Sequence, residues 1–543
     1  MSIEEQTKVL INKALEVVQS LPEASSWINY ITDLKSYVDK PCTLAIAGAQ
    51  NAGKSSFLNA FLGKNLAKVG DAATTATINK FRHGVPEDPN RPVLVHWSDG
   101  RITKEALTFM DSLQGKDEET LKKAENIDFL EYVLNDPALE DLILVDTPGT
   151  LAVTEGKGDG HQKRIDRYYQ LDKKHHEESK RQTRDADAVI YVVRGVAGKA
   201  DKDFLDTINE NSDGGSCLDA LGVMTKMDVE EAIWNRRKEQ AAYVAKSLKD
   251  QLFDVIPVSV MIWDITIQHA GNFARWQQAI KSVEDKDMLD LILSSEENFI
   301  DEEFNCVMSH DLCVEIHDAM MLPGVYWSLP RTVLYTLYNT PTPEAAIAEL
   351  KDGANMENLR KVIYEHFFER KKSIHCMKIL RELKVVLDDL YRNALHNAER
   401  ASRKRDTWIS EVRKTIWPKN SVVAEELLSF LSKNVKSSTE VDQLITKLTD
   451  EVKHPLEQLL LVEEAPNEDY ALRKDLEKNK ELWEEDEYDE LWQLFDPKKS
   501  ADYVASVNRL ERQAYWQQLA MMAFNPKIRS VAEHAVELYG RRK

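Results

Sequence analysis

The sequence predicts an α/β domain with a doubly wound, mostly parallel sheet, joined to an all-α helical region. Five short apolar runs alternate with charged, helix-like stretches, as strands buried between helices do. These runs span residues 43–47, 93–96, 142–145, 188–193 and 253–258. After about residue 275 such runs fade, and apolar residues recur at helical spacing. At 543 residues the chain also exceeds what one hydrophobic core supports.

Three parts of the chain are therefore expected. Residues 1–38 carry apolar side chains at helical spacing and predict N-terminal helices. Residues 39–275 hold the strand-like runs and predict the α/β domain. Residues 276–543 predict helices, with a break between Asn339 and Pro343.

The helical region contains three further features of note. Apolar stripes at 379–390 and 441–452 predict helices buried against other helices. The second stripe is expected to be interrupted at Pro455, because proline removes a helical hydrogen bond. The densely acidic segment 481–490 predicts a solvated helix face more readily than a partner-binding patch.

The composition narrows the classes of partner. A formal net charge of −21 opposes non-specific attraction to nucleic acid, so no nucleic-acid partner is expected and any membrane contact must be local. No apolar stretch approaches the roughly 18 residues of a membrane-spanning helix. The chain does not begin with a basic segment followed by an apolar one, and its five cysteines are scattered. We expect a cytoplasmic protein without disulfides.

A glycine-rich segment, Gly48-Ala-Gln-Asn-Ala-Gly-Lys-Ser55, matches the phosphate-binding pattern G-x-x-x-x-G-K-[ST]. It follows a strand-like run and precedes a helix-like run, which is the context that the pattern requires. Glycine lets backbone N–H groups turn toward phosphate oxygens, and the helix N-terminus adds partial positive charge. Lys54 is expected to reach the β- and γ-phosphates, and the hydroxyl of Ser55 to bind Mg²⁺. The other expected nucleotide contacts in this loop are Gly48, Gln50, Asn51, Ala52, Gly53 and Ser56.

A second segment, Asp146-Thr-Pro-Gly149, comes directly after an apolar run. This position places Asp146 at the C-terminal edge of a strand, where its carboxylate can hold Mg²⁺ through water. The backbone N–H of Gly149 can reach the γ-phosphate. The sequence therefore predicts a nucleoside triphosphate site that uses Mg²⁺ as its cofactor.

A loop of small residues with several hydroxyls, 72–77, lies between these two segments. Such a loop can close on the γ-phosphate and be released after hydrolysis. Thr75 is expected to give one oxygen to Mg²⁺, with Thr74 and Thr77 as the alternatives.

The identity of the base is predicted by Thr225-Lys-Met-Asp228, which follows a weaker apolar segment. The carboxylate of Asp228 can accept both the N1–H and the N2–H₂ of guanine, and adenine offers no such pair of donors. The stem of Lys226 can lie along the base. Ser259 closes the last strand-like run and is expected to give its backbone N–H to guanine O6. The predicted ligands are therefore GTP and GDP.

Together these segments resemble the GTPase domain of the dynamin superfamily, and of its bacterial members in particular. The loop GAQNAGKSS at 48–56 is similar, as is the stretch INKFRHG at 78–84. A spacer of about sixty residues precedes DTPG, and TKMD replaces the commoner NKxD. The resemblance covers roughly residues 40–265. It implies a GTP hydrolase whose N-terminal helices, residues 1–38, pack with the C-terminal helical region. Residues 276–543 would then supply the rest of a neck beneath the GTPase domain and a helical stalk.

The resemblance also bears on catalysis, because Thr150 stands where many small GTPases have a glutamine. In dynamins a glutamine of the phosphate loop helps to position the attacking water, and Gln50 matches it. The next residue, commonly serine, helps to hold a charge-compensating cation, but here it is Asn51, which leaves that cation's role open. The expected catalytic set is Gln50, Lys54 and Thr75. Basal turnover is expected to be low and to rise when GTPase domains pair.

Two classes of function follow. In the first, hydrolysis drives self-association through the GTPase domains and movement of the stalk, at a peripheral membrane site or with a second dynamin-like protein. The basic residues Arg400, Arg403, Lys404 and Arg405 are the expected electrostatic contact, while the apolar stretch 320–330 fits a buried helix better than a lipid-facing tip. In the second, the chain is a regulatory switch that binds an effector in its GTP form.

Overall fold

The computed structural model describes most of the 543 residues. The described residues are 2–21, 25–49, 52–63, 78–113, 123–124, 126–146, 186–195, 198–210, 220–249, 251–302, 307–321, 325–460, 462–463, 472–473, 476, 479–495 and 500–541. They form two compact units. The first comprises Met1–Lys8 and Tyr30–Val385, and the second Val9–Asn29 and Val386–Lys543.

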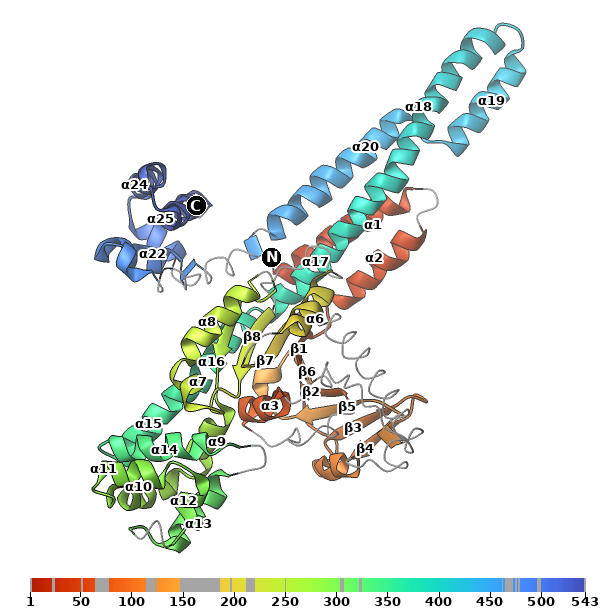
Figure 1. Ribbon diagram of the computed structural model, residues 1–543. Helices are drawn as coiled ribbons and strands as arrows, with labels where there is room; N and C mark the ends of the chain where they lie inside the picture. The colour runs from red at the N-terminus through yellow and green to blue at the C-terminus, as the bar shows by residue number, and fades with distance from the viewer. Residues whose placement is uncertain are drawn as a thin grey trace. The chain divides into compact units, whose positions relative to one another are not determined.

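A sheet forms the centre of the first unit (Figure 1). Its nine strands within the described residues have the order β4-β3-β5-β2-β6-β1-β7-β8-β9. The strands are β1 (Cys42–Gly48), β2 (Ile78–His83), β3 (Val93–Trp97), β4 (Ile102–Glu105), β5 (Ile127–Leu134), β6 (Leu142–Asp146), β7 (Ala188–Arg194), β8 (Ala220–Thr225) and β9 (Asp254–Pro257). From β6 to β9 all neighbours are parallel, whereas β2 is antiparallel to β6, and β3 to both β4 and β5. The predicted α/β class with a mostly parallel sheet is confirmed.

The five predicted runs correspond to β1, β3, β6, β7 and β9, and the weaker segment before Asp228 is β8. Strands β2 and β5 were not predicted because polar and apolar residues are mixed along them, as in Ile78-Asn-Lys-Phe-Arg-His83. This half of the sheet has partly exposed side chains, so an apolar run is not needed to form it. Strand β4 is a four-residue edge strand with exposed positions, which leaves little signal in the sequence.

Helices follow the strands. They are α3 (Lys54–Leu62), α6 (Lys199–Glu210), α7 (Glu231–Asn235), α8 (Arg237–Ser247), α9 (Val260–Gln268), α10 (Phe273–Lys281), α11 (Lys286–Ile292), α12 (Glu296–Ile300), α13 (His310–Met320), α14 (Ser328–Asn339), α15 (Pro343–Ala354), α16 (Met356–Ile363) and α17 (Lys371–Leu390). Among them, α3 packs on β1 and β6, and α8 on β9. The predicted break lies between α14 and α15, where the Thr342 hydroxyl accepts the N–H of Ala345 and Pro343 occupies the first turn. Helix α9 contacts both α3 and α15, so helices beyond residue 275 pack directly on the domain that carries the phosphate loop.

The apolar stretch around 320–330 contributes mainly to the core, as its helical spacing predicts. Met320, Leu329 and Pro330 are buried, while Tyr326 is exposed. Residues 322–324 lie outside the described residues. No helix among the described residues is both long enough and apolar enough to cross a membrane.

The amino edge of the sheet is joined to two helices by a buried histidine. His375 of α17 contacts the Asp187 carboxylate through Nδ1 at 2.9 Å, and the Tyr37 carbonyl at the end of α2 (Ser25–Tyr37) through Nε2 at 2.7 Å. Asp187 also accepts the N–H of Thr43, just inside β1, at 2.7 Å. Both ring nitrogens of His375 face acceptors, so this arrangement requires the doubly protonated imidazolium.

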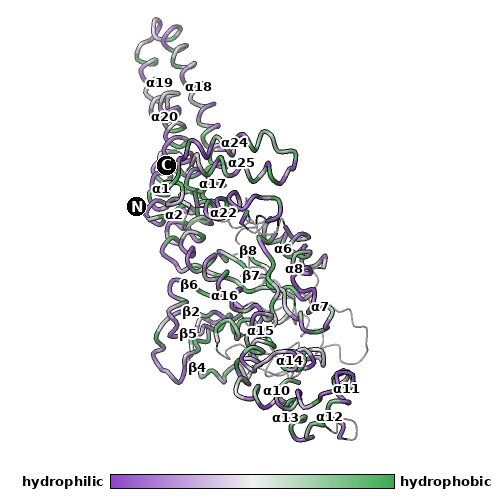
Figure 2. The backbone as a smooth tube through the Cα atoms, turned by 90° about the vertical axis from the view of Figure 1, so that its left-hand side faces the viewer, coloured by the Kyte–Doolittle hydropathy of each residue, from purple (hydrophilic) through white to green (hydrophobic). Residues whose placement is uncertain are grey.

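The second unit is helical and includes parts of α1 (Ile3–Gln19), α2 and α17. Its further helices include α18 (His396–Glu411), α19 (Ser421–Asn434) and α20 (Ser438–Leu448). Ion pairs Glu16–Lys447 at 2.8 Å and Lys13–Glu451 at 3.8 Å join α1 to the α20 region. Figure 2 shows apolar and polar residues alternating along α18 and α19, whereas strands β7 and β8 are mainly apolar.

The helix after α20 does not end at Pro455, which corrects the expected interruption. A π-type turn, Thr449–Lys453, precedes the proline, and residues 454–460 are again α-helical. A π-type turn changes the local hydrogen-bond pattern, so a helix can accommodate the N–H that proline lacks. Val452 and Leu456 remain buried on either side of the proline.

The C-terminal helices show that the acidic segment 481–490 is only partly a solvated face. They are α22 (Glu485–Leu494), α23 (Ser500–Ser506), α24 (Arg509–Met522) and α25 (Pro526–Arg541). Glu490 is buried in their core and accepts hydrogen bonds from Arg512, Trp516 (2.7 Å) and Tyr539 (2.6 Å). Leu491 and Phe495 are buried in the same core. A buried carboxylate with this many donors is a packing element rather than an exposed charge.

Candidate nucleotide-binding site

The phosphate loop connects β1 to α3, as the sequence predicts. Gly48 ends β1 so close to β7 that a Cβ atom there would lie 2.3 Å from the Val192 carbonyl oxygen. Gly53 has a φ of 88° at the N-cap of α3, a conformation that side chains rarely adopt. Ser55 and Ser56 lie half-buried in the first turn of α3, and Ala52 is buried before it. The helix N-terminus is therefore open to an anion in the way that phosphate sites use.

Lys54 lies inside this loop rather than in solvent. Its side chain is 6% exposed, and its Nζ donates to the carbonyls of Gly48 at 3.2 Å and Ala49 at 3.1 Å. Burial lowers the pKa of the Lys54 ammonium, while the nearby charge of Asp146 raises it. The ammonium is thus held at the loop that would surround a phosphate chain.

Asp146, at the end of β6, is the least satisfied charged group of the site. It is fully buried, and among the described residues no hydrogen bond of good geometry reaches either carboxylate oxygen. Burial raises its pKa to about 6, against opposing effects of Lys54 and of the neighbouring Asn79 amide. A buried carboxylate without hydrogen-bond partners can bind a hard cation such as Mg²⁺, which prefers oxygen ligands. Asp146 and the Ser55 hydroxyl are the described residues that would hold it.

The predicted base-binding loop follows β8. Thr225 donates its hydroxyl to the carbonyl of Ala52 at 2.5 Å, which ties this loop to the phosphate loop. Lys226 has a φ of 57°, and Met227 is fully buried beneath it. The left-handed turn at Lys226 leads the chain out of the strand to Asp228, which is 9% exposed. Burial raises the pKa of Asp228, while the hydrogen bond from Ser259 lowers it.

Ser259, after β9, contacts Asp228 directly. Its hydroxyl donates to the carboxylate at 2.6 Å and also accepts the N–H of Ile262 as the N-cap of α9. Its backbone N–H, which the sequence assigns to guanine O6, donates to the Ala354 carbonyl at 3.1 Å. That assignment stays a prediction, and the side-chain contact to Asp228 is a feature that the sequence analysis did not identify.

The structure brings the described candidates to one edge of the sheet. Strands β1, β6, β8 and β9 belong to its parallel part, so their C-terminal ends, which carry the phosphate loop, Asp146, Asp228 and Ser259, lie along the same edge. Ligands of open α/β sheets bind at this edge. Several expected residues lie outside the described residues: Gln50, Asn51, Thr74, Thr75, Thr77, Gly149 and Thr150.

Comparison with known proteins agrees with this site. Residues 44–227 match the model of the Dynamin family. Over 153 residues the chain is 25% identical to a probable chloroplastic transmembrane GTPase of the FZO-like type from Arabidopsis thaliana. Over the same length it is 27% identical to the isoniazid-induced protein IniC of Mycobacterium tuberculosis.

These matches cover 28% of this chain and only 14% and 30% of the two relatives, so less than a third of either relative is shared. A solved structure of an oligomerised bacterial dynamin pair is 14% identical over 99% of this chain and 95% of that chain. Its TM-score of 0.30 is too low to support a common overall arrangement.

Proposed function

We propose that this chain, a dynamin-family member through residues 44–227, binds GTP with Mg²⁺ and hydrolyses it to GDP and phosphate. The observation that carries this proposal is the pair of buried carboxylates on one sheet edge. Asp146 lies near Lys54 with both oxygens unpaired among the described residues, and Asp228 follows β8. The first suits a metal-bound phosphate chain, and the second suits the two donors of guanine.

In this mechanism the protein mainly positions charge. Lys54 would leave its loop carbonyls for the β- and γ-phosphates, while α3 directs its free N–H groups at the same oxygens. Asp146, Ser55 and Thr75 would hold Mg²⁺, which neutralises charge developing on the phosphates. Gln50 would orient the attacking water, and the N–H of Gly149 would contact the γ-phosphate. Asn51 would take the place of the serine that helps to hold a cation in dynamins.

Pairing of GTPase domains is the proposed source of activation. The phosphate loop offers Lys54, but Asn51 stands where dynamins commonly have a serine that helps to hold a charge-compensating cation. Transition-state charge is therefore only partly compensated in one chain. Specific activity is therefore expected to rise with protein concentration, and Gln50→Ala to lower kcat with little change in GTP affinity. A specific activity that is constant across a wide concentration range would contradict the pairing.

We also propose that the end of the α18–α19 hairpin contacts an anionic lipid surface. Large apolar side chains are exposed at this end, Trp417, Val422 and Val423, and farther along the hairpin, Trp408 and Phe430. Residues 400–436 contain nine Lys and Arg against four Asp and Glu, in a chain whose net charge is −21. Exposed aromatic residues among basic ones suit the boundary between headgroups and acyl chains.

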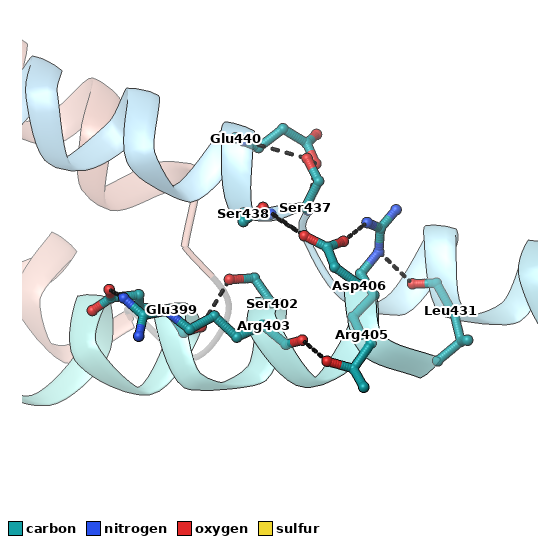
Figure 3. Close-up of polar contacts among 10 residues, drawn as sticks. Glu399, Ser402, Arg403, Arg405, Asp406, Leu431, Ser437, Ser438 and Glu440 are labelled. Carbon is teal, nitrogen blue, oxygen red and sulfur yellow. Dashed lines mark hydrogen bonds and ion pairs between the residues drawn. The ribbon is translucent and has the colours of Figure 1, made fainter. Parts of the chain in front are cut away.

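The basic residues expected from the sequence contribute unequally to this surface. Figure 3 shows Arg403 paired with Glu399, and Arg405 paired with Asp406 at 2.8 Å. The Asp406 carboxylate also accepts from Ser438 at the start of α20, so this group joins helices rather than facing a ligand. The basic residues nearer the hairpin end, Arg413, Lys414 and Lys419, are exposed and better placed for lipid.

Vesicle sedimentation tests whether the α18–α19 hairpin contacts lipid. The wild type, with a non-hydrolysable GTP analogue, is expected to sediment with phosphatidylserine vesicles and not with neutral phosphatidylcholine vesicles. A Trp417→Glu, Val422→Glu variant should stay in the supernatant, while Leu510→Glu, at an exposed apolar position outside the hairpin, should sediment normally. If the wild type binds neither vesicles nor itself, nor a second dynamin-like protein, the regulatory switch is the better description.

A further inference from the structure

The backbone of the base-binding loop is held by a helix that lies outside the strand-bearing segment. The hydroxyl of Ser328, in the first residue of α14, lies 2.9 Å from the Asp228 carbonyl oxygen and 2.5 Å from that of Val229. Its one hydroxyl hydrogen can donate to either of these two carbonyls, which belong to the predicted guanine contact and to the next residue. One hundred residues separate Ser328 from Asp228 in the chain.

The loop after β9, which carries Ser259, is held by the corner between α15 and α16. Asn355 has a φ of 58° and serves as both the C-cap of α15 and the N-cap of α16. Its side-chain amide donates to the Pro257 carbonyl at 2.9 Å, while the Ala354 carbonyl accepts the N–H of Ser259 at 3.1 Å. Two adjacent residues of the corner thus fix the backbone on both sides of Val258.

Both sets of contacts determine where the Asp228 carboxylate lies. Ser328 fixes the backbone of Asp228, and the corner fixes the backbone of Ser259, whose hydroxyl donates to the carboxylate at 2.6 Å. Helix α7, just after Asp228, adds a third contact, because Trp234 lies against Gly353 of α15. A Cβ atom at Gly353 would lie 2.7 Å from the Trp234 ring, so a larger residue does not fit without a shift.

We propose that Ser328 and Asn355 are positioning residues for guanine recognition. They hold the two loops that place Asp228, so helices α14 to α16 complete the base end of the site although they do not touch the ligand. This inference rests on the proposed role of Asp228 in binding guanine. Losing one such hydrogen bond is expected to lower affinity for guanine nucleotides about tenfold. Neither hydrogen bond involves the phosphate loop or Asp146, so kcat at saturating GTP should change less than about threefold.

The experiment measures the Kd of fluorescent GDP, and the KM and kcat for GTP and ITP, with full-length protein. ITP lacks the 2-amino group, so it makes one fewer contact with Asp228. Ser328→Ala removes the hydroxyl, and Asn355→Gly removes the amide while keeping the left-handed conformation accessible. Both variants should raise the KM for GTP about tenfold and narrow the preference for GTP over ITP. Ser328→Thr keeps the hydroxyl and should restore both values.

The matched control is Thr342→Ala. It removes the N-cap hydrogen bond to Ala345 at the opposite end of α15, so it weakens the same helix without touching either loop. Its GTP to ITP preference should equal that of the wild type. If Ser328→Ala and Asn355→Gly keep the wild-type preference, or if Thr342→Ala shifts it as much, the positioning role is wrong. If the wild type itself binds no guanine nucleotide, the proposed function fails instead.

Discussion

The base end and the phosphate end of this site differ in how far their buried charges are already satisfied. At the base end, Asp228 has a hydroxyl donor in Ser259 and a backbone held by Ser328. At the phosphate end, Asp146 is fully buried with no well-formed hydrogen bond among the described residues, and Lys54 donates to carbonyls of its own loop. The base end is thus already arranged without a ligand, whereas under the proposed function the phosphate end would gain its partners from the nucleotide and Mg²⁺.

The largest expected effect tests the base end. Asp228→Asn presents an amide donor to the N1–H and N2–H₂ of guanine, so the affinity for GTP should fall roughly 10³-fold. Xanthine has a carbonyl in place of the 2-amino group and can accept from that amide, so XTP should become the preferred nucleotide. Competition binding with GTP, XTP and ATP measures the change. Unaltered GTP binding would show that Asp228 does not contact the base.

The next effect tests whether the two ends act independently. Lys54→Met removes the buried ammonium while keeping an apolar stem of similar length, so kcat/KM for GTP should fall several hundredfold. The ratio of GTP to XTP affinity should remain that of the wild type, because Asp228 and its supports are untouched. A variant that lost base selectivity as well would show that the two ends are coupled.

A third prediction concerns the energetic consequence of the unsatisfied carboxylate. The pKa of Asp146 is raised to about 6 from an ordinary value of 3.8, so the folded state binds this proton more tightly than the unfolded chain does. The free energy of unfolding gained from this proton is complete below pH 3.8 and is lost as pH rises through 6. At pH 8, without Mg²⁺ or nucleotide, Asp146→Asn should therefore raise the free energy of unfolding by up to about 3 kcal/mol.

Urea unfolding across pH 4–8 measures this gain, which should shrink as pH falls through 6 because wild-type Asp146 then takes up a proton. The exposed Asp33→Asn, in the same unit, serves as a control that should leave the unfolding curve unchanged. The Asp146→Asn variant should also lose the stabilisation that Mg²⁺ and GTP give the wild type. A variant less stable than the wild type at pH 8 would contradict the prediction.

The smallest expected effect lies at the opposite edge of the sheet, where His375 is fully paired. Burial lowers the pKa of His375, as does Lys378, but the contacts with the Asp187 carboxylate and the Tyr37 carbonyl outweigh both and raise it. Its stabilising contribution is therefore complete below pH 6.5 and is lost as pH rises through the higher pKa of the folded state. His375→Gln should cost about 2 kcal/mol at pH 6 and less at pH 9. Thermal unfolding at both values checks this, and a cost independent of pH would show that the ring is neutral.

Short-range patterns account for what could be predicted. The spacing from Gly48 to Ser55 between a strand and a helix, and Asp146 and Asp228 at the ends of apolar runs, are local signals because each depends on a few consecutive residues. They predicted the α/β class and the sheet edge on which the site lies. Strands β2 and β5 could not be predicted in this way, because polar and apolar residues are mixed along them and several of their side chains are only partly buried.

The sequence by itself determined the chemistry of the site: an ammonium, two carboxylates and a glycine loop in an order that suits a guanine nucleotide. Only the tertiary structure decided which of these charges are paired. Ser328 and Asn355 are ordinary helix-terminal residues in the sequence, and Glu490 is one acid among many. Their roles depend on contacts across 100, 98 and up to 49 residues, and no local pattern specifies those, because side-chain hydrogen bonds require only that two groups meet in space.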